Sequence, residues 1–188
     1  PRLPHLNTPA QWCSPTACPK PQPAKYKGFV CASPHKILSN ATTRHSKRAP
    51  PVFHYPQKIL FQHCDPAGIV FYPRYYEMLN ACIEAWFDEV LGYSFAKMHG
   101  ADGRGVPTVW QNAEFHAPSR HGDALGFALR VTQVGTSSLD LEVQATCDKD
   151  QRAHFTCRLV FIRKDNGRSE PWPPELRQKL LNISKEDM

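Results

Sequence analysis

Long apolar runs are missing from this chain of 188 residues. A helix needs about 20 mostly apolar residues to cross a bilayer, so we expect no membrane-spanning segment and no membrane partner. The seven cysteines are odd in number and scattered, which argues against a disulfide framework. Unpaired thiols are typical of a reducing compartment. We therefore predict a cytoplasmic protein, with targeting to an organelle by a leader segment left open.

Acidic residues are absent from positions 1–51, which hold eight Lys and Arg and ten Pro. The rest of the chain holds 15 Lys and Arg against 17 Asp and Glu, so the formal net charge of +6 comes from the first segment. A segment so rich in Pro and so poor in consecutive apolar residues cannot bury a core, and we expect a disordered leader. The globular part has no overall attraction to nucleic acid, and we predict no such partner.

Three other interpretations of the leader are open. The lack of acids fits a transit peptide, although dense prolines disfavour the amphipathic helix of such peptides. Cys13, Cys18, Cys31 and His35 could ligate zinc by their spacing, but the prolines after Cys18 disfavour the supporting structure of a zinc finger. The Lys and Arg residues could form a nucleic-acid arm, but aromatic residues are too few for a stacking platform. We predict no metal site in this segment.

The segment 58–91 predicts a strand, a tight turn and a long helix. Apolar residues alternate briefly over positions 58–62, as in a strand. The four residues Asp65-Pro66-Ala67-Gly68 have the preferences of a type I turn. Pro73 suits the first position of a helix, where its missing N–H costs nothing. The apolar face of that helix is expected to be formed by Tyr76, Leu79, Ile83, Trp86, Phe87 and Val90.

Asp65 is the candidate for chemistry in this segment. A carboxylate just before a helix start lies near unpaired backbone N–H groups and the positive end of the helix dipole. Such N–H groups can polarise a carbonyl, while the carboxylate attacks it or activates a water molecule. The alternative is that Asp65 only accepts a hydrogen bond from the backbone of its own turn.

The sequence HCDPAGIVFYPRYYEMLNACIEAWF resembles the signature of the 4-hydroxybenzoyl-CoA thioesterase family, and a looser similarity extends over about 58–180. The resemblance implies an α+β hotdog fold over 52–188, in which a curved antiparallel sheet wraps a long central helix. It implies a homodimer or homotetramer that hydrolyses an acyl-CoA thioester to free acid and CoA without a metal or an organic cofactor. The family's catalytic carboxylate falls on Asp65, and the backbone N–H that polarises the thioester carbonyl falls on Tyr72.

Two positions depart from the family pattern. Some relatives carry a His directly after the V-[YF] pair, where this chain has Tyr72 and Pro73. Members that act on 4-hydroxybenzoyl groups have a second carboxylate on the helix, where this chain has Asn80. That difference argues against an aryl substrate with a para hydroxyl group.

Two further functions stay open. A hotdog acyl-CoA hydratase pairs an Asp with a His a few residues later, but no His lies between Asp65 and Lys97. A non-catalytic acyl-thioester binding protein would need neither residue. The Asp65 carboxylate favours the thioesterase, either as nucleophile or as general base.

Alternating apolar residues after the helix predict a series of antiparallel strands. We expect these strands at 106–116, 125–131, 139–147 and 155–163, followed by a short helix at 175–181. If the family geometry holds, the first of these strands faces the acyl pocket. Gly68, Asn80, Trp110 and Asn112 are therefore the candidate substrate-binding residues.

The phosphates of CoA need basic partners. Arg163, Lys164 and Arg168 cluster after the last strand, and the hydroxyl groups of Ser137 and Ser138 could add donors. The alternative is an ordinary solvated turn.

Overall fold

The computed structural model describes residues 52–186. The leader predicted for residues 1–51 lies outside the described residues, as do its transit-peptide, zinc and nucleic-acid interpretations. None of the described helices is both long enough and apolar enough to span a bilayer. The four cysteines of the described part, Cys64, Cys82, Cys147 and Cys157, are free thiols.

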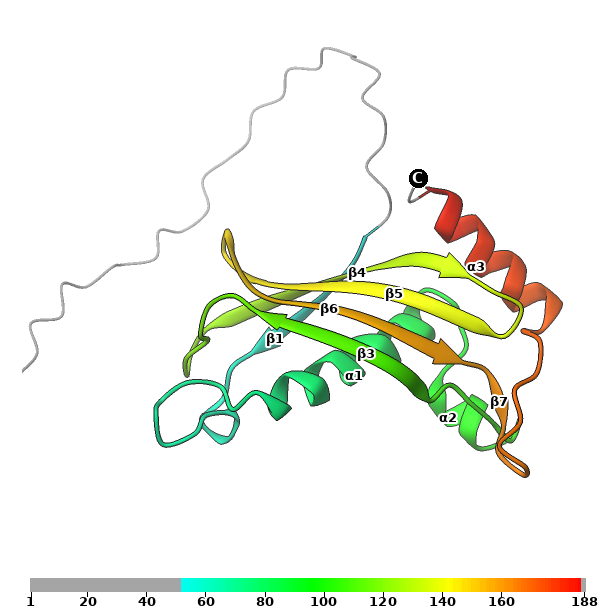
Figure 1. Ribbon diagram of the computed structural model, residues 1–188, viewed down its shortest axis with the longest axis horizontal. Helices are drawn as coiled ribbons and strands as arrows, with labels where there is room; N and C mark the ends of the chain where they lie inside the picture. The colour runs from blue at the N-terminus through cyan, green and yellow to red at the C-terminus, as the bar shows by residue number, and fades with distance from the viewer. Residues whose placement is uncertain (1–51, 187–188) are drawn as a thin grey trace, which may run out of the picture. The chain divides into compact units, whose positions relative to one another are not determined.

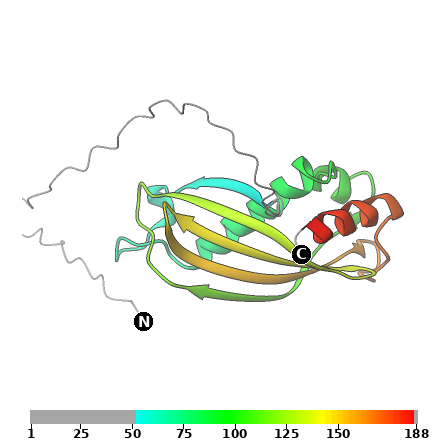
Figure 2. The ribbon, with the colours of Figure 1, turned by 90° about the horizontal axis from the view of Figure 1, so that it is seen from above.

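A curved antiparallel sheet of five strands wraps one long helix (Figure 1). The helix is α1 (Pro73–Glu89), and the strand order across the sheet is β1-β4-β5-β6-β3. Seen from above, β1 and β3 form the two edges of the sheet (Figure 2). The strands are β1 (Phe53–Lys58), β3 (Thr108–Phe115), β4 (Ala124–Val134), β5 (Ser138–Cys147) and β6 (Asp150–Val160).

Helix α1 begins at Pro73, as predicted from the sequence, but its apolar face is rotated from the expected one. Tyr76 is only half-buried and Val90 is exposed. The buried positions keep the three- and four-residue steps of a helix face: Tyr75, Met78, Leu79, Cys82, Ile83, Trp86 and Phe87. The concave side of the sheet therefore packs against the side of α1 that carries Tyr75 and Met78.

The core lies between α1 and the concave face of the sheet. On β5, Leu139, Leu141, Val143, Ala145 and Cys147 face inward, as their alternation with polar residues predicts. Matching residues of β4 and β6 lie opposite them in register, for example Leu129 and Phe155 beside Val143. Each large apolar side chain buried in this way contributes about 1.5–3 kcal/mol to stability, so the helix and the sheet stabilise each other.

The strand expected over positions 58–62 is wrong beyond Lys58. Residues Phe61–His63 form a short 3-10 turn, and the Phe61 side chain is 82% exposed. Ile59, which is fully buried, binds through its backbone to the loop before β4, with N–H to the Asp123 carbonyl at 2.8 Å. The chain leaves the sheet there because its backbone partners change from a strand to a loop.

Four short elements complete the described part. They are α2 (Phe95–His99), a small two-stranded sheet of β2 (Arg104–Gly105) and β7 (Ile162–Arg163), and α3 (Pro174–Glu186). Helix α3 is longer than the sequence predicted. It packs against β4, whose second half runs beyond the end of β1.

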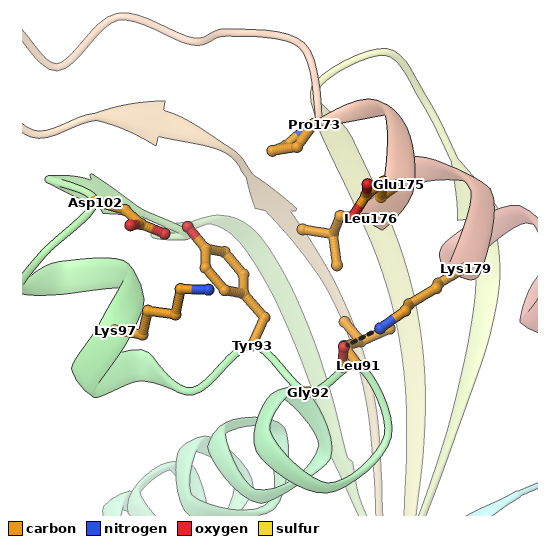
Figure 3. A pocket seen from close by; sticks show the side chains of 9 residues that line it. All are labelled: Leu91, Gly92, Tyr93, Lys97, Asp102, Pro173, Glu175, Leu176 and Lys179. Atoms are coloured by element: carbon orange, nitrogen blue, oxygen red, sulfur yellow. Dashed lines mark hydrogen bonds between the residues drawn. The ribbon is translucent and has the colours of Figure 1, made fainter.

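Helix α3 is tied to the far end of α1 (Figure 3). The Lys179 Nζ atom donates a hydrogen bond of 2.8 Å to the Leu91 carbonyl, just past the last residue of α1. Carbonyls at a helix C-terminus lack partners within the helix and carry the negative end of its dipole, so a cation is favourable there. Nearby, burial and a hydrogen bond with Asp102 raise the pKa of Tyr93 to about 12. These residues line a hollow of about 240 Å³ between α3 and the end of α1.

The convex face of the sheet carries a charged network. Glu142 on β5 accepts hydrogen bonds from Arg130 on β4, at 2.9 Å from its Nε, and contacts the His154 Nε2 on β6 at 3.0 Å. Burial raises the pKa of Glu142, but the hydrogen bonds with Arg130 and His154 outweigh it, so the pKa lies below its ordinary value. The network links three strands on the side away from α1.

Candidate active site

The four-residue turn predicted at Asp65 is present in the structure. The Gly68 N–H donates to the Asp65 carbonyl at 2.9 Å, which closes the four-residue turn. Gly68 has φ +75, a left-handed conformation that strongly favours glycine. The Asp65 Oδ1 atom accepts a hydrogen bond of 2.8 Å from the Ala67 N–H, so the structural alternative for this side chain is present. Within residues 52–186, its Oδ2 atom has no hydrogen-bond partner.

The helix start after this turn leaves one backbone donor free. The N–H groups of Phe71, Arg74 and Tyr75 are used, and bond to the carbonyls of His63, Phe71 and Tyr72. Pro73 has no N–H. Among the described residues, no hydrogen bond forms from the N–H of Tyr72. Tyr72 is the residue at which the family resemblance places the donor to the thioester carbonyl.

An apolar hollow of about 460 Å³ opens beside Tyr72. Tyr72, just before α1, and Tyr75 in α1 form one wall, and Phe115 from the end of β3 forms another. The Phe115 ring lies 5.4 Å from that of Tyr75 and 6.4 Å from that of Tyr72, between ring centroids. Ile69 from the Asp65 turn also lines the hollow, although Asp65 itself does not. The space suits the apolar part of an acyl group next to the free N–H.

Tyr75 and Ser119 complete this region, and the sequence analysis did not select them. The Tyr75 hydroxyl donates to the Ser119 Oγ at 2.7 Å in a buried bond, and burial raises the pKa of Tyr75. The Ser119 carbonyl accepts from the Val70 N–H at 2.8 Å. Ser119 therefore fixes the loop after β3 against the Asp65 turn. No local pattern could reveal a bond between residues so far apart in the chain.

His63 has a structural role in the 3-10 turn. Its Nδ1 atom accepts a hydrogen bond of 3.0 Å from the Leu60 N–H. Burial lowers the pKa of His63, and the nearby Arg74 lowers it further. The ring thus stabilises the 3-10 turn as a neutral acceptor.

Two predicted pocket residues lie on the other face of the sheet. Trp110 pairs with Arg158, and Asn112 with Thr156, which places both on the convex side. Phe115 and its partner Ala153 lie on the concave side with the core. Within one chain, the structure therefore does not bring Trp110 and Asn112 to the hollow beside Tyr72. Their role in substrate binding stays a prediction.

The predicted phosphate ligands gather at the end of β6 that lies beside the start of β3. The Phe161 N–H binds the Ser137 carbonyl at 2.7 Å, so the Ser137-Ser138 pair adjoins the cluster. Arg163 is paired with Asp165 at 2.7 Å, whereas the Arg168 guanidinium has no ion pair within residues 52–186. About seven strand residues, on the order of 23 Å, separate this end of β3 from Phe115.

Comparison with known proteins identifies the superfamily of this chain. Residues 59–180 match the family model of the thioesterase-like superfamily. The chain belongs to the thioesterase-like superfamily. The 1,4-dihydroxy-2-naphthoyl-CoA hydrolase of Synechocystis sp. is 24% identical over 64% of this chain and 91% of its own length. The enzyme of the same name from Prochlorococcus marinus is 23% identical over 55% of this chain and 73% of its own length.

Solved structures confirm the hotdog fold of this thioesterase-like protein. A 1,4-dihydroxy-2-naphthoyl-CoA thioesterase from Synechocystis superposes with a TM-score of 0.64 at 20% identity, over 70% of this chain and 96% of that one. A gentisyl-coenzyme A thioesterase gives 0.63 at 23% identity, over 68% and 99%. A Staphylococcus aureus protein in complex with CoA gives 0.68 at 14% identity, over 80% and 90%.

The prediction of a thioester hydrolase is confirmed at the level of the superfamily, whose curated relatives carry that name. The narrower 4-hydroxybenzoyl-CoA thioesterase family, the substrate and the catalytic residues belong to the proposal that follows.

Proposed function

We propose that this thioesterase-like protein hydrolyses an acyl-CoA thioester with Asp65 as the catalytic carboxylate and the Tyr72 N–H as the donor to the thioester carbonyl. The observation that carries the proposal is the Tyr72 N–H, which has no partner within residues 52–186 and belongs to a residue that lines an apolar hollow, four residues after the Asp65 turn. The site resembles that of the 4-hydroxybenzoyl-CoA thioesterase family at both positions.

The chemistry follows from these two groups. The carbonyl oxygen of the thioester accepts a hydrogen bond from the Tyr72 N–H, and this bond strengthens as negative charge develops on the oxygen. The Asp65 Oδ2 atom attacks the carbonyl carbon and expels CoA as a thiolate, which leaves a mixed anhydride that water then hydrolyses. Alternatively, Asp65 takes a proton from a water molecule that attacks directly. The hydrogen bond from the Ala67 N–H fixes the carboxylate in either role.

A second copy of the chain completes the proposed enzyme. β3 is an edge strand, paired only with β6 among the described strands, and Val109 and Trp110 on it are each 57% exposed. The Gln111 Nε2 atom on the same strand is buried without a partner in the described part. Unpaired edges are templates for another strand, and a two-fold axis would pair β3 with itself in antiparallel fashion. We propose a homodimer, or a homotetramer built from such dimers.

The same two-fold arrangement accounts for the distant phosphate ligands. Antiparallel pairing of β3 brings the Thr108 end of one copy to the Phe115 end of the other. The Arg168 guanidinium and the Ser137-Ser138 pair of one copy would then lie near the Asp65 turn of its partner. We propose that these residues bind the phosphates of CoA.

Release of free thiol tests the proposed reaction. Wild type, Asp65→Asn and the control Asp88→Asn, an exposed acid on α1, are compared on benzoyl-CoA, 1,4-dihydroxy-2-naphthoyl-CoA and straight-chain acyl-CoAs. We expect Asp65→Asn to lose at least about 10²-fold in kcat, and Asp88→Asn to match wild type. Hydration of an enoyl-CoA without thiol release would instead indicate a hydratase. Binding of acyl-CoA with neither reaction would indicate a non-catalytic protein.

A further inference from the structure

The hollow between α3 and the end of α1 lies apart from the proposed reaction site (Figure 3). We name it the α3 hollow, and its volume is about 240 Å³. It shares no lining residue with the hollow beside Tyr72, nor with a hollow of about 350 Å³ near the start of β3 that Asn80 lines. Tyr72 precedes α1 and Leu91 follows it, and a helix of 17 residues is about 26 Å long.

One wall of the α3 hollow carries Lys97 from α2 and Asp102 from the loop that follows α2. The side chain of Tyr93 interacts with each of these two charges separately. The Lys97 Nζ atom lies over the Tyr93 ring, 5.7 Å from its centroid, whereas the Asp102 carboxylate meets the Tyr93 hydroxyl group. Burial and this hydrogen bond raise the pKa of Tyr93 to about 12, so the hydroxyl stays protonated and donates. Within residues 52–186, the Lys97 ammonium has no ion pair.

The opposite wall is the first part of α3, with Glu175 and Lys179. A Glu four residues before a Lys has the spacing that favours an ion pair along a helix. Here the Lys179 Nζ atom instead donates to the Leu91 carbonyl at 2.8 Å. The Glu175 carboxylate therefore has no hydrogen bond or ion pair in the described part of the chain. In Figure 3 the side chains of Lys97 and Lys179 extend into the hollow from opposite walls.

The α3 hollow thus presents two positive and two negative groups, none of them paired with another. Because these formal charges sum to zero, a simple anion or a simple cation gains no net attraction from them. An ammonium group has three donors, so Lys97 and Lys179 both have donors to spare, and both carboxylates have free acceptor sites. Leu91, Leu176 and Pro173 supply apolar surface between the two walls. The hollow is complementary to a molecule that carries both charges beside an apolar group.

We infer that the α3 hollow binds a small zwitterion, of the class of α-amino acids with an apolar side chain. The carboxylate of the ligand accepts hydrogen bonds from Lys97 and Lys179, and its ammonium group donates to Asp102 and Glu175. Its side chain packs on the apolar surface that includes Leu176. Pockets for drug-sized ligands measure about 300–1,000 Å³, so a hollow of about 240 Å³ admits only a small molecule. The ligand bridges α3 to α2 and the loop after it.

Calorimetric titration of the full chain with three matched probes tests the class of ligand. The probes are L-leucine, 4-methylpentanoate, which is leucine without its amino group, and 3-methylbutylamine, which is leucine without its carboxyl group. We expect the dissociation constant of leucine to be about 10- to 100-fold lower than that of either other probe, because each of them loses its hydrogen bonds to one pair of charges. Equal binding of leucine and either other probe would overturn the zwitterion. No heat from leucine up to about 10 mM would overturn the site.

Two substitutions test whether leucine binds in the α3 hollow. Lys97→Met removes one cation, and Asp102→Asn removes one negative charge but keeps an acceptor for the Tyr93 hydroxyl, so each should weaken leucine binding about 10-fold. Lys149→Met and Asp148→Asn, the matched changes in the exposed turn between β5 and β6, should bind leucine as wild type does. Thermal unfolding checks that all four variants are folded. Affinity within about 3-fold of wild type in either Lys97→Met or Asp102→Asn would contradict the assignment.

The same two variants predict a change of preference among the probes. In Lys97→Met, leucine should lose more affinity than 3-methylbutylamine, which has no carboxylate to bind the lysine. In Asp102→Asn, leucine should lose more affinity than 4-methylpentanoate, which has no ammonium group. An equal loss for all three probes would overturn the charge pairing. None of the substituted residues lines the hollow beside Tyr72, so the result does not depend on whether Asp65 hydrolyses an acyl-CoA.

Discussion

Replacing Tyr72 by proline removes the backbone N–H that we propose as the donor to the thioester carbonyl. The same substitution also removes the tyrosine ring. The backbone at Tyr72 has φ −50, within the range that proline adopts. Its N–H has no partner within residues 52–186, so its loss breaks no hydrogen bond of the described fold. Tyr72→Ala is the matched control, because it removes the ring and keeps the N–H. The difference between the two variants therefore measures the backbone donor.

We expect Tyr72→Pro to lower kcat about 10²- to 10³-fold relative to Tyr72→Ala, the usual effect of removing one donor to a developing oxyanion. Thiol release under saturating acyl-CoA measures kcat, and thermal unfolding checks that both variants are folded. A thioether analogue of the substrate, which lacks the carbonyl oxygen, should bind both variants equally. If folded Tyr72→Pro turns over within about 3-fold of Tyr72→Ala, the Tyr72 N–H does not polarise the thioester.

Three predictions concern stability. Tyr75→Phe leaves the buried Ser119 hydroxyl without its partner, and should lower the free energy of unfolding by about 1–2 kcal/mol in urea titrations. Lys179→Met removes the bond to the Leu91 carbonyl and should cost about 0.5–2 kcal/mol, while kcat stays unchanged. Because the folded pKa of Glu142 is depressed, its contribution is present above the unfolded pKa and is lost as pH falls through the folded pKa. Wild type should therefore lose more stability than Glu142→Gln between about pH 5 and pH 3; equal losses would contradict the pKa shift.

Local features of the sequence were sufficient where their cause is local. Pro73 starts α1 because its ring suits the first helical position, and the alternation along β5 reflects the two faces of a single strand. The turn at Asp65 could be predicted for the same reason, because Asp, Pro and Gly each favour one position of a four-residue turn. The resemblance to a thioesterase signature rests on this same contiguous stretch, and it led to the superfamily that the comparison confirms.

Features that depend on distant partners needed the tertiary structure. Phe61 looked like part of a strand, but the backbone of Ile59 binds the loop before β4 and the strand ends early. The bond between Tyr75 and Ser119 joins segments that no periodicity relates. Lys164 was selected as a basic residue for phosphate, yet its ammonium donates a hydrogen bond to the His99 carbonyl at the end of α2, a contact between distant segments that no local pattern predicts. The spacing of residues along the chain indicates which side chains share one face of a helix or strand. Which residues of different elements come into contact depends on how the sheet curves around the helix.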